Sequence, residues 1–428
     1  MQKRWEHVGR LTLMVSLLYS SMVGVVAGQT DSTLYRLGKA LYELNEKEIY
    51  EKTVDVMNAY LIGYPQGEKA AEVQLSLANL HNDRKKRDRA FVSYLKTVIL
   101  YPGSPQVTEA KEKANEAVSK DGKLVPIKEK LVSLLGLKVE DTELSNKYFR
   151  LLQELRDLIY PKLNEAVIPE CQVFVETYPD HPNAPLVAEW VGDMYRENKK
   201  HWEALTGYLR VVHLYAGSDR DLSCRLKMGD LYSSQLKRFE DAVRTYESIL
   251  RSEADSLLKS ESQWKLARVL HEKMTNHAWA AKEYQNLVDQ FPNNPHCVEA
   301  LMNRAELQVS KLKQLEGGIA TYRQIVERFP EHTDAPQALI SAGEVYEKKM
   351  KDYENAIQTY QEVSEKYPSN PQSAETLFKA AELAEKKLKD INRAMDLYQQ
   401  VVDKFSEGKI AVEALRKIES LKKQSEGE

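Results

Sequence analysis

The sequence predicts an all-α fold, a solenoid of antiparallel helix pairs. Two observations predict it. A tyrosine recurs every 38 residues through the second half of the chain, and a small residue stands four positions before each one. The six tyrosines are Tyr208, Tyr246, Tyr284, Tyr322, Tyr360 and Tyr398. A fixed period of this length is typical of stacked helical repeats.

The repeat unit is clearest between Ala335 and Pro368. Its second helix places apolar side chains at intervals of four, three and four residues, which is the spacing of one helical face. These side chains belong to Ala356, Tyr360, Val363 and Tyr367. The polar stretch 348–352 predicts the turn between the two helices. Pro368 predicts a helix end, because proline lacks the backbone N–H and clashes with the preceding turn.

The first helices carry a matching column of small residues. Its members are Gly192, Gly229, Ala267, Ala305, Gly343 and Ala381. Their spacing is 38 residues, except for a first interval of 37. Small side chains let two helices approach closely, and we expect the large tyrosine to fill the gap between neighbouring repeats. A single pair cannot bury its apolar face, so the pairs must stack.

One set of residues in this unit falls at the signature positions of a known repeat. The set is Leu339, Gly343, Tyr346, Ala356, Tyr360 and Pro368. With these residues the unit resembles the tetratricopeptide repeat, with one extra residue in the turn between the helices. The long period and the aromatic-Pro-x-x-Pro ends, as in 291–295, are similar to bacterial envelope proteins such as the BamD-type outer-membrane assembly lipoprotein and the Tol–Pal division coordinator. The resemblance implies a right-handed superhelix whose first helices line the inner face.

Repeat quality divides the chain into five segments. They are a signal peptide at 1–28, degenerate repeats at 29–119, an irregular helical joint at 120–160, a regular array at 161–405, and a capping helix with a tail at 406–428. The repeat signature is missing between Tyr101 and Tyr178. The joint is either a bend with its own contact surface or a degenerate repeat without a special role, and both alternatives stay open.

The N-terminus resembles a secretory signal. Basic residues precede an apolar stretch at 11–26, and small residues follow at Ala27 and Gly28. Cleavage would change the formal charge from −3 to −5, because three cations and one carboxylate are lost. An uncleaved anchor is the alternative. Gln29 stands where a lipoprotein signal has cysteine, so we expect a soluble, unlipidated protein in the periplasm or an equivalent compartment, without a further membrane span.

Motifs for catalysis and cofactor binding are missing from the sequence. It has no phosphate-binding glycine loop and no nucleophile elbow. Thr275 stands where a zinc-protease helix that begins at His271 would need its second histidine. We therefore predict no enzyme activity, no cofactor, no metal and, from a net charge of −3, no nucleic-acid partner. Three scattered cysteines suit a core better than a disulfide, and Cys171 takes the place of a tyrosine.

Clusters of cations recur at the ends of the first helices. They are Arg84 to Arg87, Lys199-Lys200, Lys237-Arg238, Lys348-Lys349 and Lys386-Lys387. Cations are favoured at the negative end of the helix dipole, and Asp352 and Asp390 open the following helices, where anions are favoured. A basic ridge that touches anionic surfaces is the secondary interpretation.

Two columns mark the expected inner face. The acidic column is Asp193, Asp230, Glu306, Glu344 and Glu382, and the apolar column is Leu226, Trp264, Met302, Ile340 and Phe378. We predict that a basic, partly apolar protein segment binds there, with Trp264 and Phe378 as its aromatic anchors. The alternatives are that the apolar column is core and that the acidic column is ordinary solvated surface.

The sequence thus favours a non-enzymatic, extracytoplasmic protein–protein interaction scaffold. Its task would be the assembly or maintenance of an envelope or secreted complex. The alternative is a structural subunit of a large extracytoplasmic enzyme assembly or filament, which would self-associate. The size of the mature chain in solution discriminates between these two functions.

Overall fold

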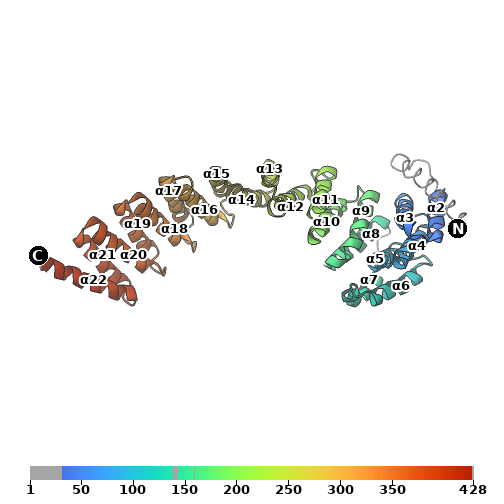
Figure 1. The fold of residues 1–428 in the computed structure, drawn as a ribbon, viewed down its shortest axis with the longest axis horizontal. Coiled ribbons are helices and arrows are strands. Elements are labelled where there is room, and N and C mark those ends of the chain that lie inside the picture. The colour runs from blue at the N-terminus through green and yellow to red at the C-terminus, as the bar shows by residue number, and fades with distance from the viewer. Residues whose placement is uncertain (1–30, 138–142, 159, 427–428) are drawn as a thin grey trace. The chain divides into compact units, whose positions relative to one another are not determined.

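The structure is a computed structural model that describes residues 31–137, 143–158 and 160–426. Within these ranges all regular structure is helical and no strand occurs, so the predicted all-α class is confirmed (Figure 1). Contacts divide the chain into two compact units, 1–224 and 225–428. The predicted signal segment lies outside the described residues. Among the helices described, none combines the length and apolar composition that crossing a membrane requires.

The first unit is built of short helices in consecutive pairs. They are α2 (Asp31–Leu44), η1 (Lys47–Ile49), α3 (Tyr50–Gly63), α4 (Ala70–Asp83), α5 (Arg87–Leu100), α6 (Val107–Lys120), η2 (Val125–Ile127), α7 (Lys128–Leu135), α8 (Leu144–Asp157), η3 (Pro161–Leu163), α9 (Asn164–Thr177), α10 (Ala184–Glu197) and α11 (His201–Leu214). Helix α12 (Asp221–Ser234) begins in this unit and continues into the second.

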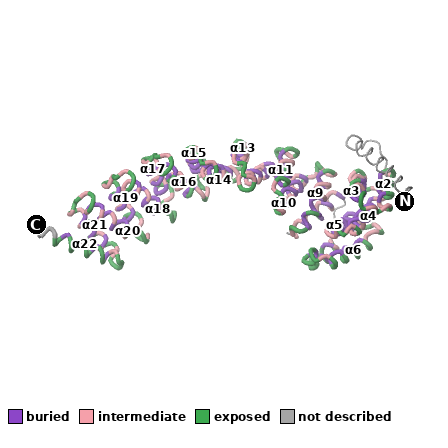
Figure 2. Tube along the Cα trace, viewed as in Figure 1, coloured by how far each residue is buried: buried purple, intermediate pink, exposed green. Residues whose placement is uncertain are grey.

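The second unit continues the helix pairs to the C-terminus. They are α13 (Phe239–Leu250), α14 (Ser256–Glu272), α15 (His277–Gln290), α16 (Cys297–Ser310), α17 (Leu315–Arg328), α18 (Ala335–Glu344), η4 (Val345–Met350), α19 (Tyr353–Lys366), α20 (Ser373–Leu383), η5 (Ala384–Leu388), α21 (Ile391–Lys404) and α22 (Lys409–Glu426). Buried residues follow the faces where neighbouring helices meet (Figure 2).

The tyrosine period marks the core, as predicted. Tyr246 is 1% exposed and Tyr360 is fully buried. A Cβ added at Gly343 would lie 2.5 Å from the Tyr360 ring, and one added at Gly229 would lie 2.4 Å from Tyr246. The tyrosine rings therefore pack directly on the backbone of the first helices. This close approach is the physical reason for a small residue at these positions.

The turn between the two helices explains the extra residue of the repeat. In the first unit the amides of Lys86 and Lys200 donate to carbonyls five residues earlier. In the second unit the corresponding amides reach six residues back, as Asp352 does to Tyr346. The additional residue widens the helix end into a π turn, seen as η4 and η5. The Asp352 side chain accepts the amide of Asn355 at 3.2 Å, which confirms its role as a helix start.

Each of these turns holds one residue in the left-handed region, and most of them are lysines. They are Lys85, Lys199, Lys237, Thr275, Lys313, Lys351 and Lys389, with φ between 51° and 61°. Side chains with a Cβ are disfavoured there, and helix ends of this kind usually carry glycine. The lysines therefore hold a mildly strained backbone at the end of the first helices.

We expect Lys351→Gly to stabilise the second unit by about 0.5–1 kcal/mol, because glycine adopts positive φ without steric cost. Lys349→Gly, two residues earlier inside the π turn at negative φ, should instead destabilise by a similar amount. The midpoints of urea unfolding would compare the two variants. Equal destabilisation by both would show that the backbone at Lys351 is not strained.

The joint is helical, and it interrupts the regular stacking of the first unit. Helices α6 and α7 pack against α5, while α8 packs against α5 and α9. Helix α9 also contacts α3, so the second helices of distant repeats come together. Cys171 of α9 is fully buried, which confirms its prediction as a core residue, and all three cysteines are free thiols.

Candidate interaction surface

The apolar column of the first helices lies in the core. Trp264 is 6% exposed and Phe378 is 8% exposed. Trp264 stacks on His296 with ring centroids 4.5 Å apart, and Phe378 lies 5.1 Å from Tyr398. The prediction that Trp264 and Phe378 are exposed anchors is therefore wrong. Each stands three residues before a small core residue, so both positions share the helical face that packs against neighbouring helices.

The carboxylates of the acidic column are mostly paired with cations. Asp193 lies 3.5 Å from Arg196, Asp230 lies 2.9 Å from Lys265, and Glu344 lies 2.8 Å from Lys348. Glu382 pairs with Lys386. Glu306 is exposed, and no ion pair to it is found among the described residues. The column therefore carries less free charge than its carboxylates suggest.

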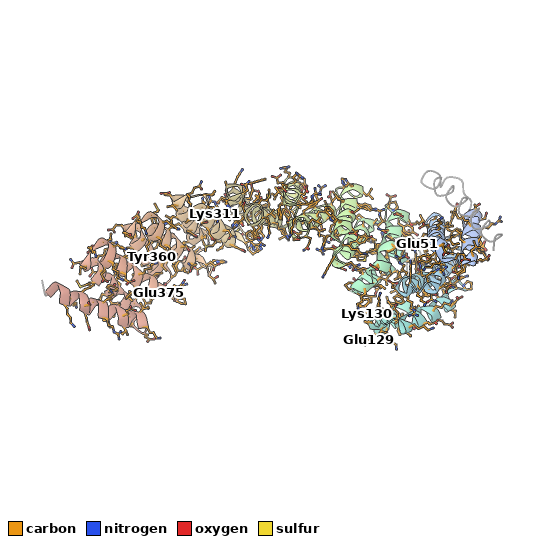
Figure 3. The ribbon with its side chains drawn as sticks, in the orientation of Figure 1. Glu51, Glu129, Lys130, Lys311, Tyr360 and Glu375 are labelled. Atoms are coloured by element: carbon orange, nitrogen blue, oxygen red, sulfur yellow. The ribbon has the colours of Figure 1, made fainter. Side chains whose placement is uncertain are left out.

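A recurring contact, which we term the latch, ties each of several repeats to the next. In it a buried tyrosine donates to a carboxylate of its own first helix, and a lysine of the following first helix binds the same carboxylate. Tyr360 lies where α18, α19 and α20 meet (Figure 3), and its hydroxyl donates to Glu347 at 2.7 Å, while Lys379 binds Glu347 at 2.8 Å. Tyr398, Glu385 and Lys417 repeat this arrangement.

The latch has a second form, in which the carboxylate stands one turn earlier. Tyr246 donates to Asp230 at 2.8 Å, and Lys265 closes the contact. Burial alone raises the pKa of Glu347, but the hydrogen bonds from Lys379 and Tyr360 outweigh it and lower that pKa. Ionised carboxylates thus link neighbouring repeats.

The middle repeats of the second unit lack the latch lysine. Asn303 and Ser341 stand where Lys265 and Lys379 stand in their neighbours. There the Tyr284 hydroxyl lies 3.1 Å from the Nδ1 atom of His271. Our sequence reasoning missed this lysine column, although its 38-residue spacing is as regular as that of the acidic column. The signal was the position itself, two residues before the small residue.

A buried polar cluster joins the helices of the first unit. The ammonium group of Lys96 on α5 lies 2.7 Å from the carboxylate of Glu170 on α9, and both residues are less than 10% exposed. Tyr148 of α8 also donates to Glu170. Burial raises the pKa of Glu170, but Lys96 and Tyr148 outweigh it, so the pKa is lowered.

His81 extends the cluster towards α3. Its Nδ1 atom lies 2.7 Å from the hydroxyl of Tyr50. Burial lowers the pKa of His81 to about 4, so the ring is neutral at pH 7. Each polar group in this cluster has a partner in a different helix. The cluster therefore holds α3, α4, α5, α8 and α9 in one arrangement, as buried polar networks do when they are satisfied.

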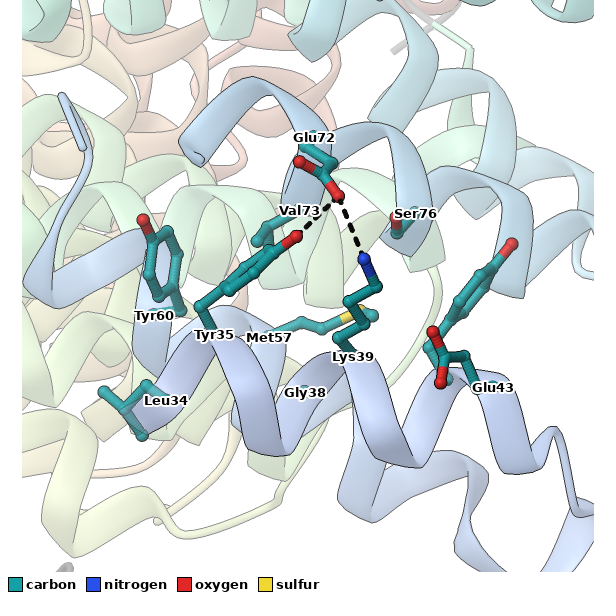
Figure 4. A pocket seen from close by; sticks show the side chains of 11 residues that line it. Leu34, Tyr35, Gly38, Lys39, Glu43, Met57, Tyr60, Glu72, Val73 and Ser76 are labelled. Atoms are coloured by element: carbon teal, nitrogen blue, oxygen red, sulfur yellow. Dashed lines mark hydrogen bonds and ion pairs between the residues drawn. The ribbon is translucent and has the colours of Figure 1, made fainter. Parts of the chain in front are cut away.

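The first repeat contains a pocket between α2, α3 and α4 (Figure 4). Its volume is about 170 Å³. Gly38 and Met57 form part of its lining, beside Tyr35 and Tyr42. The Tyr35 hydroxyl donates to Glu72 across the rim at 2.7 Å. This hydrogen bond and burial raise the pKa of Tyr35, so the hydroxyl stays protonated. The pocket combines an aromatic wall with a polar edge.

Two sequence profiles match parts of the chain. A tetratricopeptide-repeat profile matches residues 299–332, and a profile of the soluble NSF attachment protein, SNAP, matches residues 331–418. No curated protein matches the chain.

Solved helical-repeat proteins are similar to the chain in part. YrrB, described as a TPR protein with an unusual peptide-binding site, is 16% identical; the match covers 47% of this chain and 96% of that one, with a TM-score of 0.32. A tetratricopeptide repeat protein from Parabacteroides merdae is 12% identical over 63% of this chain and 98% of its own, with a TM-score of 0.34. Pseudomonas aeruginosa pilF is 15% identical over 54% and 95%, with a TM-score of 0.32.

These comparisons concern fold alone. Together with the packed helix pairs and the glycine–tyrosine contacts, the matched profile identifies the repeats as tetratricopeptide-type. None of the matches supports the more specific resemblance to the BamD-type or Tol–Pal proteins, which stays a prediction. The chain is a tetratricopeptide-type helical-repeat protein.

Proposed function

We propose that the chain is a non-enzymatic, extracytoplasmic scaffold that holds protein partners during assembly or maintenance of an envelope or secreted complex. The observation that carries this proposal is the latch. Titratable groups such as Glu347 and Lys379 bind one another across repeat boundaries instead of converging on a reaction centre. They keep the first helices at a set spacing. The extracytoplasmic location rests on the signal-like sequence at 1–28.

The partner surface that we propose in the second unit lies on α16, α18 and α20, around Glu306, Glu344 and Glu382. Glu306 is exposed, and the lysines that pair with the other two carboxylates are more than half exposed. Exposed ion pairs of this kind contribute about 0–1 kcal/mol. A basic segment of a partner can therefore replace those lysines at little cost. The apolar part of the predicted ligand loses its support, because Trp264 and Phe378 are buried.

Site-specific photo-crosslinking in the native cell tests the scaffold function. A photoreactive residue at Glu306 should capture a defined protein, and one at Gln358, exposed on the second helix α19, should not. Reversal of Glu306, Glu344 and Glu382 to lysine should weaken binding of the recovered partner at least tenfold. The matched control reverses three exposed acids of second helices, Glu316, Glu365 and Asp396, and should retain binding. Equal capture at both positions would contradict the proposed surface.

The structural-subunit function has an observation in its favour. Helix α22 ends the array with Val412 and Leu415 about half exposed, at 50% and 45%. Apolar side chains at the end of a solenoid are available for end-to-end contact. Size-exclusion chromatography of residues 29–428 across a range of concentrations separates the two functions. A monomer agrees with the scaffold, whereas a polymer that grows with concentration and is abolished by Leu415→Glu agrees with the structural subunit.

A further inference from the structure

The first repeat lacks the tyrosine that fills the other repeats. In most repeats this tyrosine stands seven residues before the aromatic residue that ends the unit. The pairs are Tyr94 with Tyr101, Tyr208 with Tyr215, Tyr284 with Phe291, Tyr360 with Tyr367 and Tyr398 with Phe405. In the first repeat the residue seven positions before Tyr64 is Met57. A thin, flexible thioether chain thus occupies the place of an aromatic ring.

The pocket lies where the ring is missing. In a complete repeat, a Cβ added at Gly192 would lie 2.5 Å from the ring of Tyr208. In the first repeat, a Cβ added at Gly38 would meet only Met57 Cγ and Val56 Cγ1, both at 3.6 Å. Glycine at this position therefore leaves room that no neighbouring side chain takes. The pocket of about 170 Å³ is lined by both Gly38 and Met57.

The pocket has the size and the walls that suit an aromatic ring. An engineered apolar cavity of about 150 Å³ binds benzene, so 170 Å³ accommodates one substituted ring. The rings of Tyr35, Tyr42 and Tyr60 provide edges and faces for aromatic contacts. Figure 4 shows Tyr35 and Lys39 reaching from α2 towards Glu72 on α4.

The polar edge of the pocket suits a hydroxyl group. Glu43 is exposed at its edge, and the side chain of Glu72 is 36% exposed. In the complete repeats the buried tyrosine donates to a polar side chain of its own first helix, as Tyr94 does to Asn79 at 2.8 Å. A carboxylate at the rim offers the same kind of acceptor to an incoming phenol.

We propose that this pocket binds an aromatic side chain, preferably tyrosine, from a segment of a partner protein. The ring would lie over Gly38 and Met57, and its hydroxyl would donate to Glu43 or Glu72. The chain's own repeats define the ligand, because each complete repeat holds a tyrosine in the corresponding place. This inference rests on the proposed scaffold function for the origin of the segment, but the pocket itself can be tested with a small molecule.

The test measures binding of p-cresol, the side chain of tyrosine, to residues 29–428 by NMR of labelled methionine methyl groups. We expect p-cresol to shift the Met57 resonance with millimolar affinity, and cyclohexylmethanol, which has equally many non-hydrogen atoms, to bind at least fivefold more weakly. Met57→Tyr restores the internal tyrosine and should abolish p-cresol binding while raising the unfolding midpoint. Unchanged p-cresol binding by a folded Met57→Tyr variant would overturn the proposal.

A pair of glycine variants gives a matched control. Gly38→Ala introduces a methyl group at ordinary contact distance, so the variant should fold and should weaken p-cresol binding at least fivefold. Gly63→Ala, at the end of α3, meets nothing within 4 Å and should leave the affinity unchanged. Equal affinities of the two variants, or wild-type protein without detectable p-cresol binding, would reject the pocket. Partner capture at Glu306 would still support the scaffold in that case, and failed capture with intact p-cresol binding would reject the scaffold alone.

Discussion

Tyr360→Ala is expected to destabilise the second unit by about 3–5 kcal/mol, the range of large aromatic truncations in well-packed cores. Tyr360 is fully buried, and its ring packs against the backbone of Gly343. The helices cannot close the cavity without breaking contacts on their other faces. The truncation also removes a hydrogen bond from Glu347.

Tyr360→Phe separates the ring from the hydroxyl. This variant keeps the packing and loses only the hydrogen bond to Glu347, so it should cost about 1–2 kcal/mol. Hydrogen exchange measures both effects locally, and we expect reduced protection in α18, α19 and α20 and smaller changes in α13, since repeats interact mainly with their neighbours. Similar losses for alanine and phenylalanine would show that the latch, rather than the ring, stabilises this boundary.

Lys96→Met is expected to destabilise the first unit by about 3–5 kcal/mol at pH 7, because it leaves the buried carboxylate of Glu170 without its cation. The loss should shrink at low pH. In the wild type, the lowered pKa of Glu170 gives stability that is present above the unfolded pKa and is lost as pH falls through the folded pKa. In the variant, burial is unopposed by Lys96 and raises the pKa, so its deficit appears as pH rises above the unfolded value.

The double variant Lys96→Met/Glu170→Leu provides the control. Replacing both charges with apolar side chains should recover most of the stability, since buried ion pairs often contribute no more than well-packed hydrophobic residues. Urea unfolding at pH 4.5 and pH 7, with hydrogen exchange in α5 and α9, would measure the recovery. A double variant as unstable as Lys96→Met would show that packing around Lys96, and not the pairing of charges, decides the stability.

The candidate surface was only partly predictable. Spacing alone placed Trp264 and Glu306 on the same first-helix columns as their equivalents, but spacing does not state how far a column is rotated towards the neighbouring helix. Position 264 faces the core and position 306 faces solvent, although both lie on inner helices. The lysines of the latch were overlooked because their partners belong to the preceding repeat, outside the unit within which columns were compared.

The sequence by itself determined the helical-repeat fold, the core tyrosines and the extra residue in each turn. These features follow from local periodicity and from the size of side chains such as Gly343 and Tyr360, which repeat in phase. Only the tertiary structure decided that Lys96 pairs with Glu170, 74 residues away, and that Met57 leaves a pocket beside Gly38. Both depend on which helices meet and how much volume remains between them, and no interval along the chain encodes either quantity.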